Sequence, residues 1–288
     1  MCKHTHPDNE TTSFLSPPNS SAIGGMETKE KQLEDGSIPK VIHDVGRQWQ
    51  QESDSWKTLN PEYTLEFYDD DRCIAFIRQH YPQYEFTYSH RLKSVRRFDF
   101  IRYLIVHHYG GIYADGDITC KIPIRNWGIS NETTFLSGIE CVGCNDIGAQ
   151  VIQWTFGATK NHPILHHIIQ NVIANSIKSP SYYERFGPHN KVIHMTGPSA
   201  FSDGVMAYLV ERGTCDPKVG DWNDNRGFVI CSSIVSFGFA SGVQIFPWYR
   251  WGSARDGDMP HIPDDVLVVG GEVSFIHHGY RGSWVGMD

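Results

Sequence analysis

The 288-residue sequence has no long apolar run and no excess of basic residues. No stretch approaches the roughly eighteen apolar residues that a membrane helix needs. The formal net charge of −8 provides no basic field for nucleic acid. No G-x-G-x-x-G motif follows the first expected strand and no P-loop is present, which disfavours dinucleotide-binding and P-loop domains. We therefore expect a globular protein that does not bind nucleic acid.

The seven cysteines do not form the pattern of a zinc site or a disulfide scaffold. Because the number is odd, at least one cysteine is free or paired between chains. Cys141 and Cys144 form a single C-x-x-C pair, and no second pair follows at zinc spacing. We expect a local disulfide or plain thiols here and no structural zinc.

The first 36 residues lack the apolar segment of a signal peptide. They are polar and rich in Ser, Pro, Asn and Glu, so they cannot bury enough apolar surface to fold. The chain as a whole is 40% hydrophobic, which is enough for a sizeable core. We therefore expect residues 1–36 to be disordered and residues 37–288 to form a single domain.

Short strands and helices alternate along the first part of the chain. Residues 38–46 and 64–68 read as strands, and residues 49–59 and 71–80 as helices. This alternation predicts an α/β fold with a parallel sheet. In such sheets, ligands bind outside the carboxyl ends of strands where the strand order switches. His43, in the first strand, is either a nucleotide contact or a packed core residue.

Further elements are expected along the rest of the chain. The expected strands are 135–140, 150–158, 228–231 and 243–246, and the expected helices are 163–176 and one that contains the apolar stripe 205–210. A Thr-Gly-Pro turn at 196–198 would place a helix N-terminus near the site, where its amides could face an anion or a sugar hydroxyl. Trp154 is either a core residue or a platform for a sugar.

The most informative stretch runs from Arg97 to Thr119. Its first half reads as a buried helix over 98–106, in which Asp99 and Arg102 lie on one face. Burying two charges costs several kcal/mol each unless they pair or meet a ligand. Two interpretations are open, a structural ion pair and a ligand-binding pair.

A double glycine then ends the helix, and residues 112–119 read as one strand. The period-two alternation places Tyr113, Asp115 and Asp117 on one face, with the two carboxylates about 7 Å apart at Cβ. Like charges so close together require a cation. Oxygen ligands suit Mg²⁺ or Mn²⁺, which keep open positions for substrate phosphates.

The Asp-x-Asp tripeptide alone is not specific, because this chain carries it at 69–71, 115–117 and 256–258. The first copy lies where a strand gives way to a helix, and we expect it to cap that helix. The last lies in a stretch rich in Gly and Pro, and we expect a solvated turn. Only the copy at 115–117 follows a buried charged helix, a double glycine and an apolar strand.

The pattern Arg-x-Asp-x-x-Arg-Tyr, six residues, then Gly-Gly-Ile-Tyr-x-Asp-x-Asp spans residues 97–117. It resembles the sugar-nucleotide signature of the DXD-containing glycosyltransferases, which include the yeast-type initiating α-1,6-mannosyltransferases and the inositol-phosphoceramide mannosyltransferases. Similar blocks follow at 153–155, 162–165 and 196–198. The resemblance implies a GT-A-type fold, a Rossmann-like mixed sheet flanked by helices.

The resemblance also implies the reaction. It implies a retaining, metal-dependent glycosyltransferase that moves a hexose, with mannose from GDP-mannose as the expected donor, onto a glycan or glycolipid acceptor. The expected cofactor is Mn²⁺ or Mg²⁺. Relatives of this kind are usually anchored in the Golgi by an N-terminal membrane helix, so a Golgi location is expected. The lack of a visible anchor leaves a soluble cytoplasmic protein as the alternative.

The resemblance further implies roles for residues of the signature. Asp117 is expected to bind the metal directly, and Asp115 to share the metal and reach the ribose. Asp99 and Arg102 are expected to hold the hydroxyls of the donor sugar and a phosphate. Tyr113 is expected to contact the diphosphate, on the same face as the two carboxylates.

The C-terminal stretch resembles the closing block of the same family. His277 is expected to complete the metal site, with His278 as the substitute, since a neutral imidazole suits Mn²⁺. The alternative is that both histidines only pack. Ser283 and Trp284 are expected to close over the diphosphate. Val285 stands where the family often has a lysine, so one phosphate contact is missing.

Two other functions remain open from the sequence. Asp115 and Asp117 could form the acid/base pair of a glycoside hydrolase, although both would project from one strand instead of flanking a bond. The missing lysine and the missing anchor also leave room for a non-catalytic protein that binds a nucleotide sugar.

Overall fold

The computed structural model describes residues 36–142, 149–186, 190–213, 239–240, 242–251 and 273–279, all within the unit Leu33–Asp288. Several sequence-based expectations lie outside these residues and stay predictions. They are the disorder of residues 1–35, the strand at 228–231, the turn at 256–258, and the state of the Cys141–Cys144 pair, whose side chains are not described.

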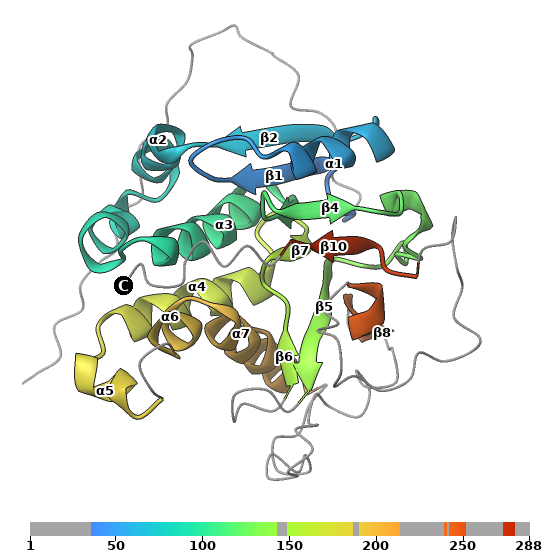
Figure 1. Ribbon diagram of the computed structural model, residues 1–288. Helices are drawn as coiled ribbons and strands as arrows, with labels where there is room; N and C mark the ends of the chain where they lie inside the picture. The colour runs from blue at the N-terminus through green and yellow to red at the C-terminus, as the bar shows by residue number, and fades with distance from the viewer. Residues whose placement is uncertain are drawn as a thin grey trace, which may run out of the picture. The chain divides into compact units, whose positions relative to one another are not determined.

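A mixed eight-stranded sheet forms the centre of the unit (Figure 1). The strand order is β2-β1-β3-β7-β5-β9-β8, and β6 pairs with β5 beside this path. β1 runs parallel to β2 and β3, whereas β7 runs antiparallel to β3. The strands are β1 (Val41–Val45), β2 (Thr64–Tyr68), β3 (Gly111–Ala114), β4 (Ile118–Cys120), β5 (Phe135–Val142), β6 (Ala149–Val151), β7 (Thr155–Ala158), β8 (Phe239–Ala240), β9 (Val243–Phe246) and β10 (Ile276–His278).

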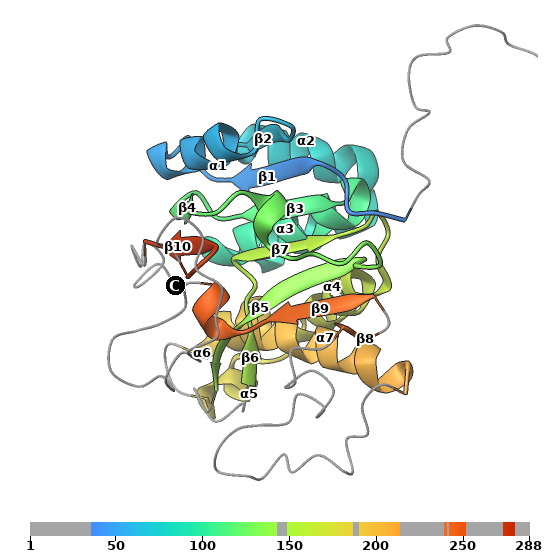
Figure 2. The same ribbon diagram turned by 90° about the vertical axis from the view of Figure 1, so that its right-hand side faces the viewer.

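Helices flank this sheet, so the predicted mixed α/β class is confirmed. The α-helices are α1 (Asp54–Leu59), α2 (Asp70–His80), α3 (Val95–Tyr109), α4 (Pro163–Ser176), α5 (Pro180–Glu184), α6 (Asn190–Met195) and α7 (Pro198–Glu211). Shorter helical turns are η1 (Gln51–Ser53), η2 (Pro82–Tyr84), η3 (Thr87–Arg91), η4 (Ile124–Asn126) and η5 (Trp248–Arg250). In Figures 1 and 2, α4 lies between α3 and α7, and it packs against both.

Side-chain caps explain where two of these helices begin. The carboxylate of Asp69 accepts a hydrogen bond from the backbone N–H of Arg72 at 2.8 Å, which confirms the cap predicted for the first Asp-x-Asp copy. His162 caps α4 by accepting from the N–H of Ile164 at 3.1 Å, and Pro163 occupies the first turn.

Two hydrophobic cores cover the two faces of the sheet, as the period-two alternation of β3 requires. Tyr113 belongs to the core that also contains the buried faces of α3, α4 and α7. Ile112 belongs to the other core, with Trp56, Trp127 and Trp251. β3 is therefore buried on both faces up to its carboxyl end.

The expected single strand over 112–119 is wrong. β3 ends at Ala114, and the chain makes a turn in which the N–H of Ile118 donates to the carbonyl of Asp115 at 3.0 Å. β4 then pairs antiparallel with β10 in a separate two-stranded sheet. Gly116 permits the turn, because a Cβ there would lie 2.8 Å from Cγ of Gln50. Alternation of apolar residues cannot reveal such a break.

The expected strand over 150–158 is also divided, into β6 and β7. The N–H of Ile152 donates to the carbonyl of Gly138 at 2.8 Å, and the chain then leaves the ladder for two residues. Gln153 and Trp154 lie in this connection, beside the turn that follows β3.

The double glycine is required where α3 meets β3. Gly110 and Gly111 have φ angles of 69° and 103°, which residues other than glycine rarely adopt. A Cβ on Gly111 would also lie 2.5 Å from Cγ1 of Val41 in the neighbouring strand. The predicted end of the helix is thus confirmed.

Within the part of the chain that the structure describes, no helix combines the length and the apolar character required to cross a membrane.

Candidate functional site

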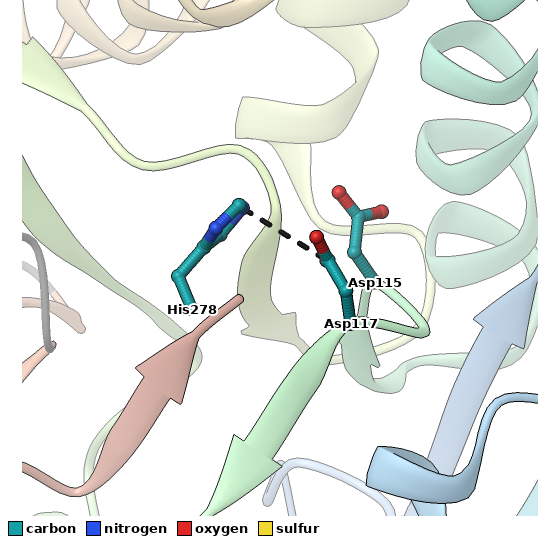
Figure 3. Close-up of side chains that lie close together, drawn as sticks. All are labelled: Asp115, Asp117 and His278. Atoms are coloured by element: carbon teal, nitrogen blue, oxygen red, sulfur yellow. Dashed lines mark ion pairs between the residues drawn. The ribbon is translucent and has the colours of Figure 1, made fainter. Parts of the chain in front are cut away.

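Three potential metal ligands converge at the turn after β3 (Figure 3). Asp115 follows β3, Asp117 precedes β4, and His278 ends β10. One ligand atom from each lies within 4.8 Å of the others, and Nε2 of His278 is 4.0 Å from Oδ1 of Asp117. Figure 3 shows the imidazole facing the two carboxylates across a shared space. Two distant segments of the chain therefore supply one group of ligands.

The donor set fits a divalent cation. Ligand atoms with bonds of about 2.1 Å to one octahedral cation lie about 3.0 Å apart when adjacent and about 4.2 Å apart when opposite, so the group must close to bind one ion. Two carboxylates with one imidazole suit Mn²⁺ better than Mg²⁺, which prefers oxygen ligands. The side chains of Asp115, Asp117 and His278 are 26%, 21% and 14% exposed, so a ligand from solution can reach them.

Of the two histidines expected near the metal, the structure places His278, and not His277, beside Asp115 and Asp117. β10 pairs with β4 so that His278 stands opposite Ile118 and His277 opposite Thr119. Neighbouring residues of a strand point to opposite sides, and His277 is exposed, outside the ligand group. The geometry therefore favours the substitute, His278, as the candidate ligand.

Two contacts hold the end of β10 against the turn. The N–H of Gly279 donates to the carbonyl of Asp117 at 3.0 Å. Trp154 packs edge-on against His278, with 4.7 Å between ring centroids and 69° between planes. Trp154 is buried, and this contact orients the imidazole.

Donors within the protein fix the carboxylate of Asp115. Nη2 of Arg102 lies 3.2 Å from Oδ1 and Nη1 lies 3.4 Å from Oδ2, while the hydroxyl of Tyr113 also donates to Oδ1. The backbone N–H of Asp115 donates to the carbonyl of Trp154 at 2.9 Å. Burial raises the pKa of Asp115 to about 6 despite Arg102 and Tyr113, so protons compete with a cation in mildly acidic solution.

Asp99 and Arg102 are buried together on α3, with exposed side-chain fractions of 2% and 4%. Nη2 of Arg102 lies 3.3 Å from Oδ1 of Asp99. The ion pair offered by the sequence is therefore present, and Arg102 extends it to Asp115. Burial lowers the pKa of Arg102, but the charge of Asp115 and then of Asp99 outweighs it, so the pKa is raised.

Two residues of this network were not found from the sequence. The amide of Gln153 contacts both Asp99 and Arg102. The hydroxyl of Thr196 donates to Oδ2 of Asp99 at 2.7 Å. Both residues lie in blocks that carry the family resemblance, which was the available signal. The Thr-Gly-Pro turn thus contacts the network through its threonine.

Asp44, at the carboxyl end of β1, is a third carboxylate near the turn that sequence reasoning missed. Its Oδ2 accepts from the hydroxyl of Ser53 at 2.8 Å, and its buried Oδ1 has no hydrogen-bond partner. Burial raises the pKa of Asp44 to about 7, and the charges of Asp115 and Asp117 add to the shift. The only sequence signal for Asp44 was that it directly follows His43, the expected nucleotide contact.

His43 itself lies inside the fold. Its Nε2 is 2.8 Å from the carbonyl oxygen of Gly110, and burial lowers its pKa to about 4. The neutral ring therefore ties β1 to the end of α3, which favours the packing interpretation. Ser283 and Trp284, expected to contact the diphosphate, lie outside the described residues.

Comparison with known proteins identifies a family signature in this region. Residues 46–134 match the family model described as "Glycosyltransferase sugar-binding region containing DXD motif". The matched residues include α3, β3 and the turn with Asp115 and Asp117.

Several fungal proteins are similar over a longer part of the chain. Inositol phosphoceramide mannosyltransferase 1 of Schizosaccharomyces pombe is 27% identical over 201 residues, which cover 67% of this chain and 56% of that protein. Mannosyl phosphorylinositol ceramide synthase CSH1 of Saccharomyces cerevisiae is 29% identical over 203 residues, 67% of this chain and 48% of that protein. Initiation-specific alpha-1,6-mannosyltransferase of Candida albicans is 28% identical over 179 residues, 54% and 46% respectively. The chain spans about half the length of these curated relatives.

Proposed function

We propose that the chain is a DXD-containing glycosyltransferase, as its similarity to that family suggests, and that it transfers mannose from GDP-mannose to a glycan or glycolipid with the help of a divalent cation. The main support for the proposal is that Asp115, Asp117 and His278 lie close together although His278 is far from the two aspartates in the sequence. The mannosyl donor is proposed because the similar proteins are named mannosyltransferases.

The residues of the site have distinct tasks in this proposal. Asp117 and His278 hold the cation directly, and Asp115 completes the group. The cation, which we propose to be Mn²⁺, neutralises the charge of the leaving diphosphate. Arg102 and Tyr113 keep Asp115 in the orientation that the group needs, because both donate to its oxygens.

Asp99 and Arg102 act in this proposal through Asp115 instead of contacting the donor sugar. Their polar atoms are already occupied by partners inside the protein, since Arg102 contacts Asp99, Asp115 and Gln153. A fully buried pair of this kind is costly to rearrange. We therefore propose positioning roles for both residues.

The transfer is proposed to retain the configuration of the sugar. The acceptor oxygen bonds to the anomeric carbon as the bond from that carbon to the phosphate oxygen breaks, and the leaving phosphate takes the acceptor proton. Asp115 and Asp117 are committed to the cation at one turn, whereas a glycoside hydrolase needs two carboxylates that flank the bond. A Golgi location remains a prediction from the resemblance.

A donor screen tests the proposal without an acceptor. GDP-mannose, UDP-glucose, UDP-galactose and UDP-GlcNAc are incubated with the protein, with and without Mn²⁺, and slow donor hydrolysis is followed. We expect hydrolysis of GDP-mannose that requires Mn²⁺. The variant Asp117→Ala should lose about 10³-fold in rate, because a metal contributes several kcal/mol.

The other described Asp-x-Asp copy provides a matched control for this screen. Asp71 is exposed in the first turn of α2, outside the ligand group. The variant Asp71→Ala should keep the rate of the unaltered protein. A hydrolysis rate that does not depend on Mn²⁺, or that is higher for a UDP-sugar than for GDP-mannose, contradicts the proposal. Binding of GDP-mannose without any turnover would point to a binding protein.

A further inference from the structure

The side chain of Gln153 lies at the centre of the buried network behind the metal ligands. Its Oε1 accepts from Nη1 of Arg102 at 2.7 Å. It also lies 3.1 Å from the hydroxyl oxygen of Tyr103, which has a shorter hydrogen bond, of 2.7 Å, to the carbonyl of Thr196. The Nε2 of Gln153 donates to Oδ1 of Asp99 at 3.3 Å. Only 9% of Gln153 is exposed. One amide thus joins a carboxylate and a guanidinium.

The backbone around Gln153 contacts the same residues. Its carbonyl accepts from Nη1 of Arg102 at 3.4 Å, and the next carbonyl, that of Trp154, accepts from the N–H of Asp115 at 2.9 Å. The connection between β6 and β7 therefore holds Asp115 in two ways, directly through the backbone and indirectly through Arg102.

Only an amide can make this set of contacts. The position needs a donor toward the carboxylate of Asp99 and an acceptor toward Arg102, and a glutamine side chain offers both. An ionised glutamate would face Asp99 without a proton to donate. A methionine of similar length would leave buried donors unpaired, which costs about 1–3 kcal/mol for each group.

Arg102 depends on this amide for its orientation. Its contact with Oε1 of Gln153 at 2.7 Å is much shorter than its contacts with Asp115, at 3.2 and 3.4 Å. Because the guanidinium is planar, fixing one nitrogen fixes the direction of the other. Without the amide, the guanidinium can turn toward either Asp99 or Asp115.

We propose that Gln153 is a positioning residue of the metal centre, which holds Arg102 so that Arg102 presents the carboxylate of Asp115 to the cation. The inference rests on the proposed function, since it assumes that Asp115 and Asp117 bind a divalent cation. It predicts that cation affinity depends on an amide at position 153, although Gln153 does not touch the cation.

Gln153→Met tests the inference against the matched variant Gln150→Met. Gln150 is another buried glutamine, three residues earlier, and its amide donates to Glu140 instead of the network. Each variant loses a buried hydrogen-bonding group, so both should lower the melting temperature. Binding of Mn²⁺ is measured by electron paramagnetic resonance of the free ion. We expect affinity to fall about 10–100-fold in Gln153→Met and to stay within about twofold in Gln150→Met.

An exchange of the amide and the carboxylate provides a second test. Gln153→Glu alone should weaken Mn²⁺ binding, because two carboxylates then face each other. In the double variant Asp99→Asn, Gln153→Glu, the asparagine donates to the glutamate and the number of charges is unchanged. We expect the double variant to regain at least about tenfold of the lost affinity, a coupling that only interacting residues show.

The outcomes separate this inference from the proposed function. If the unaltered protein binds no Mn²⁺, the proposed function fails. If the unaltered protein binds Mn²⁺ and Gln153→Met binds it equally well, the proposed function stands and the role of Gln153 is refuted. That role is also refuted if both glutamine variants lose affinity equally, or if the double variant recovers nothing. If Gln153→Met fails to fold, the comparison of Gln153→Glu with the double variant Asp99→Asn, Gln153→Glu tests the role of Gln153.

Discussion

The two halves of the proposed metal centre are built differently. Asp115 lies at the end of the large sheet, where Arg102, Tyr113 and a backbone hydrogen bond hold it. Asp117 directly precedes β4 and His278 ends β10, and among the described residues these two strands pair only with each other. We therefore expect the first half to be preorganised and the second half to adjust more when a cation binds.

The strongest test of the fixed half is the removal of its charge partner. Arg102→Met removes the guanidinium that contacts both Asp99 and Asp115, and breaking a buried ion pair in this way costs about 3–5 kcal/mol. We expect a large drop in the free energy of unfolding, measured by urea denaturation without metal. A stability within about 1 kcal/mol of the unaltered protein would show that the network is not rigid.

The pH dependence of stability tests a second buried carboxylate near the turn. The pKa of Asp44 is raised to about 7 from 3.8, so the folded protein binds a proton that the unfolded chain has released. This stabilisation is complete below the unfolded pKa and is lost as the pH rises toward 7. Asp44→Asn should remove this loss, and at pH 8 it should be more stable by up to about 4 kcal/mol.

Denaturation with EDTA present at pH 4.5 and pH 8 measures the effect of Asp44. The comparison between Asp44→Asn and the unaltered protein cancels the contributions of other groups. An equal difference in unfolding free energy at both pH values would contradict a raised pKa at Asp44.

The adjustable half is tested by two neighbouring histidines. His278→Ala should lose about 100-fold in the Mn²⁺-dependent hydrolysis of GDP-mannose, because one of three protein ligands is removed. His277→Ala, one residue away and exposed, should stay within about twofold. A larger loss in His277→Ala than in His278→Ala would reverse the assignment that the pairing of β10 and β4 supports.

Cation binding should stabilise the β4–β10 half of the site more than the β3 half. Mn²⁺ at 100 times its dissociation constant stabilises the folded protein by about 2.7 kcal/mol. We expect a higher melting temperature with Mn²⁺, no change in Asp117→Ala, and reversal by EDTA. Hydrogen exchange should slow in β4 and β10 and change little in β3. Equal slowing in all three strands would mean that the two halves respond as one.

Local sequence signals predicted much of the fold. The cap at Asp69, the buried helix α3 and the glycines at 110 and 111 follow from short-range rules, and the structure confirms them. The turn at Gly116 could not be predicted, because alternation continues through it and the break depends on the pairing of β4 with β10, a segment far along the chain.

The candidate site was predicted where its residues are close in sequence. Asp99, Arg102, Asp115 and Tyr113 fall within one motif. Gln153 is 54 residues from Asp99 and Thr196 is 97 residues away, so only the folded chain shows that they meet. The choice between His277 and His278 depended on the register of β10 with β4, which a strand pattern does not fix.

The pairing of β4 with β10 has a consequence for biosynthesis. The ribosome synthesises β1, β3 and Asp117 long before His278. A nascent chain therefore holds the two carboxylates of the site before the imidazole is available. If the proposed function holds, donor hydrolysis would then stay slow until β10 is made and pairs with β4. A chain arrested before Ile276 would therefore hold both carboxylates of the site but lack its imidazole.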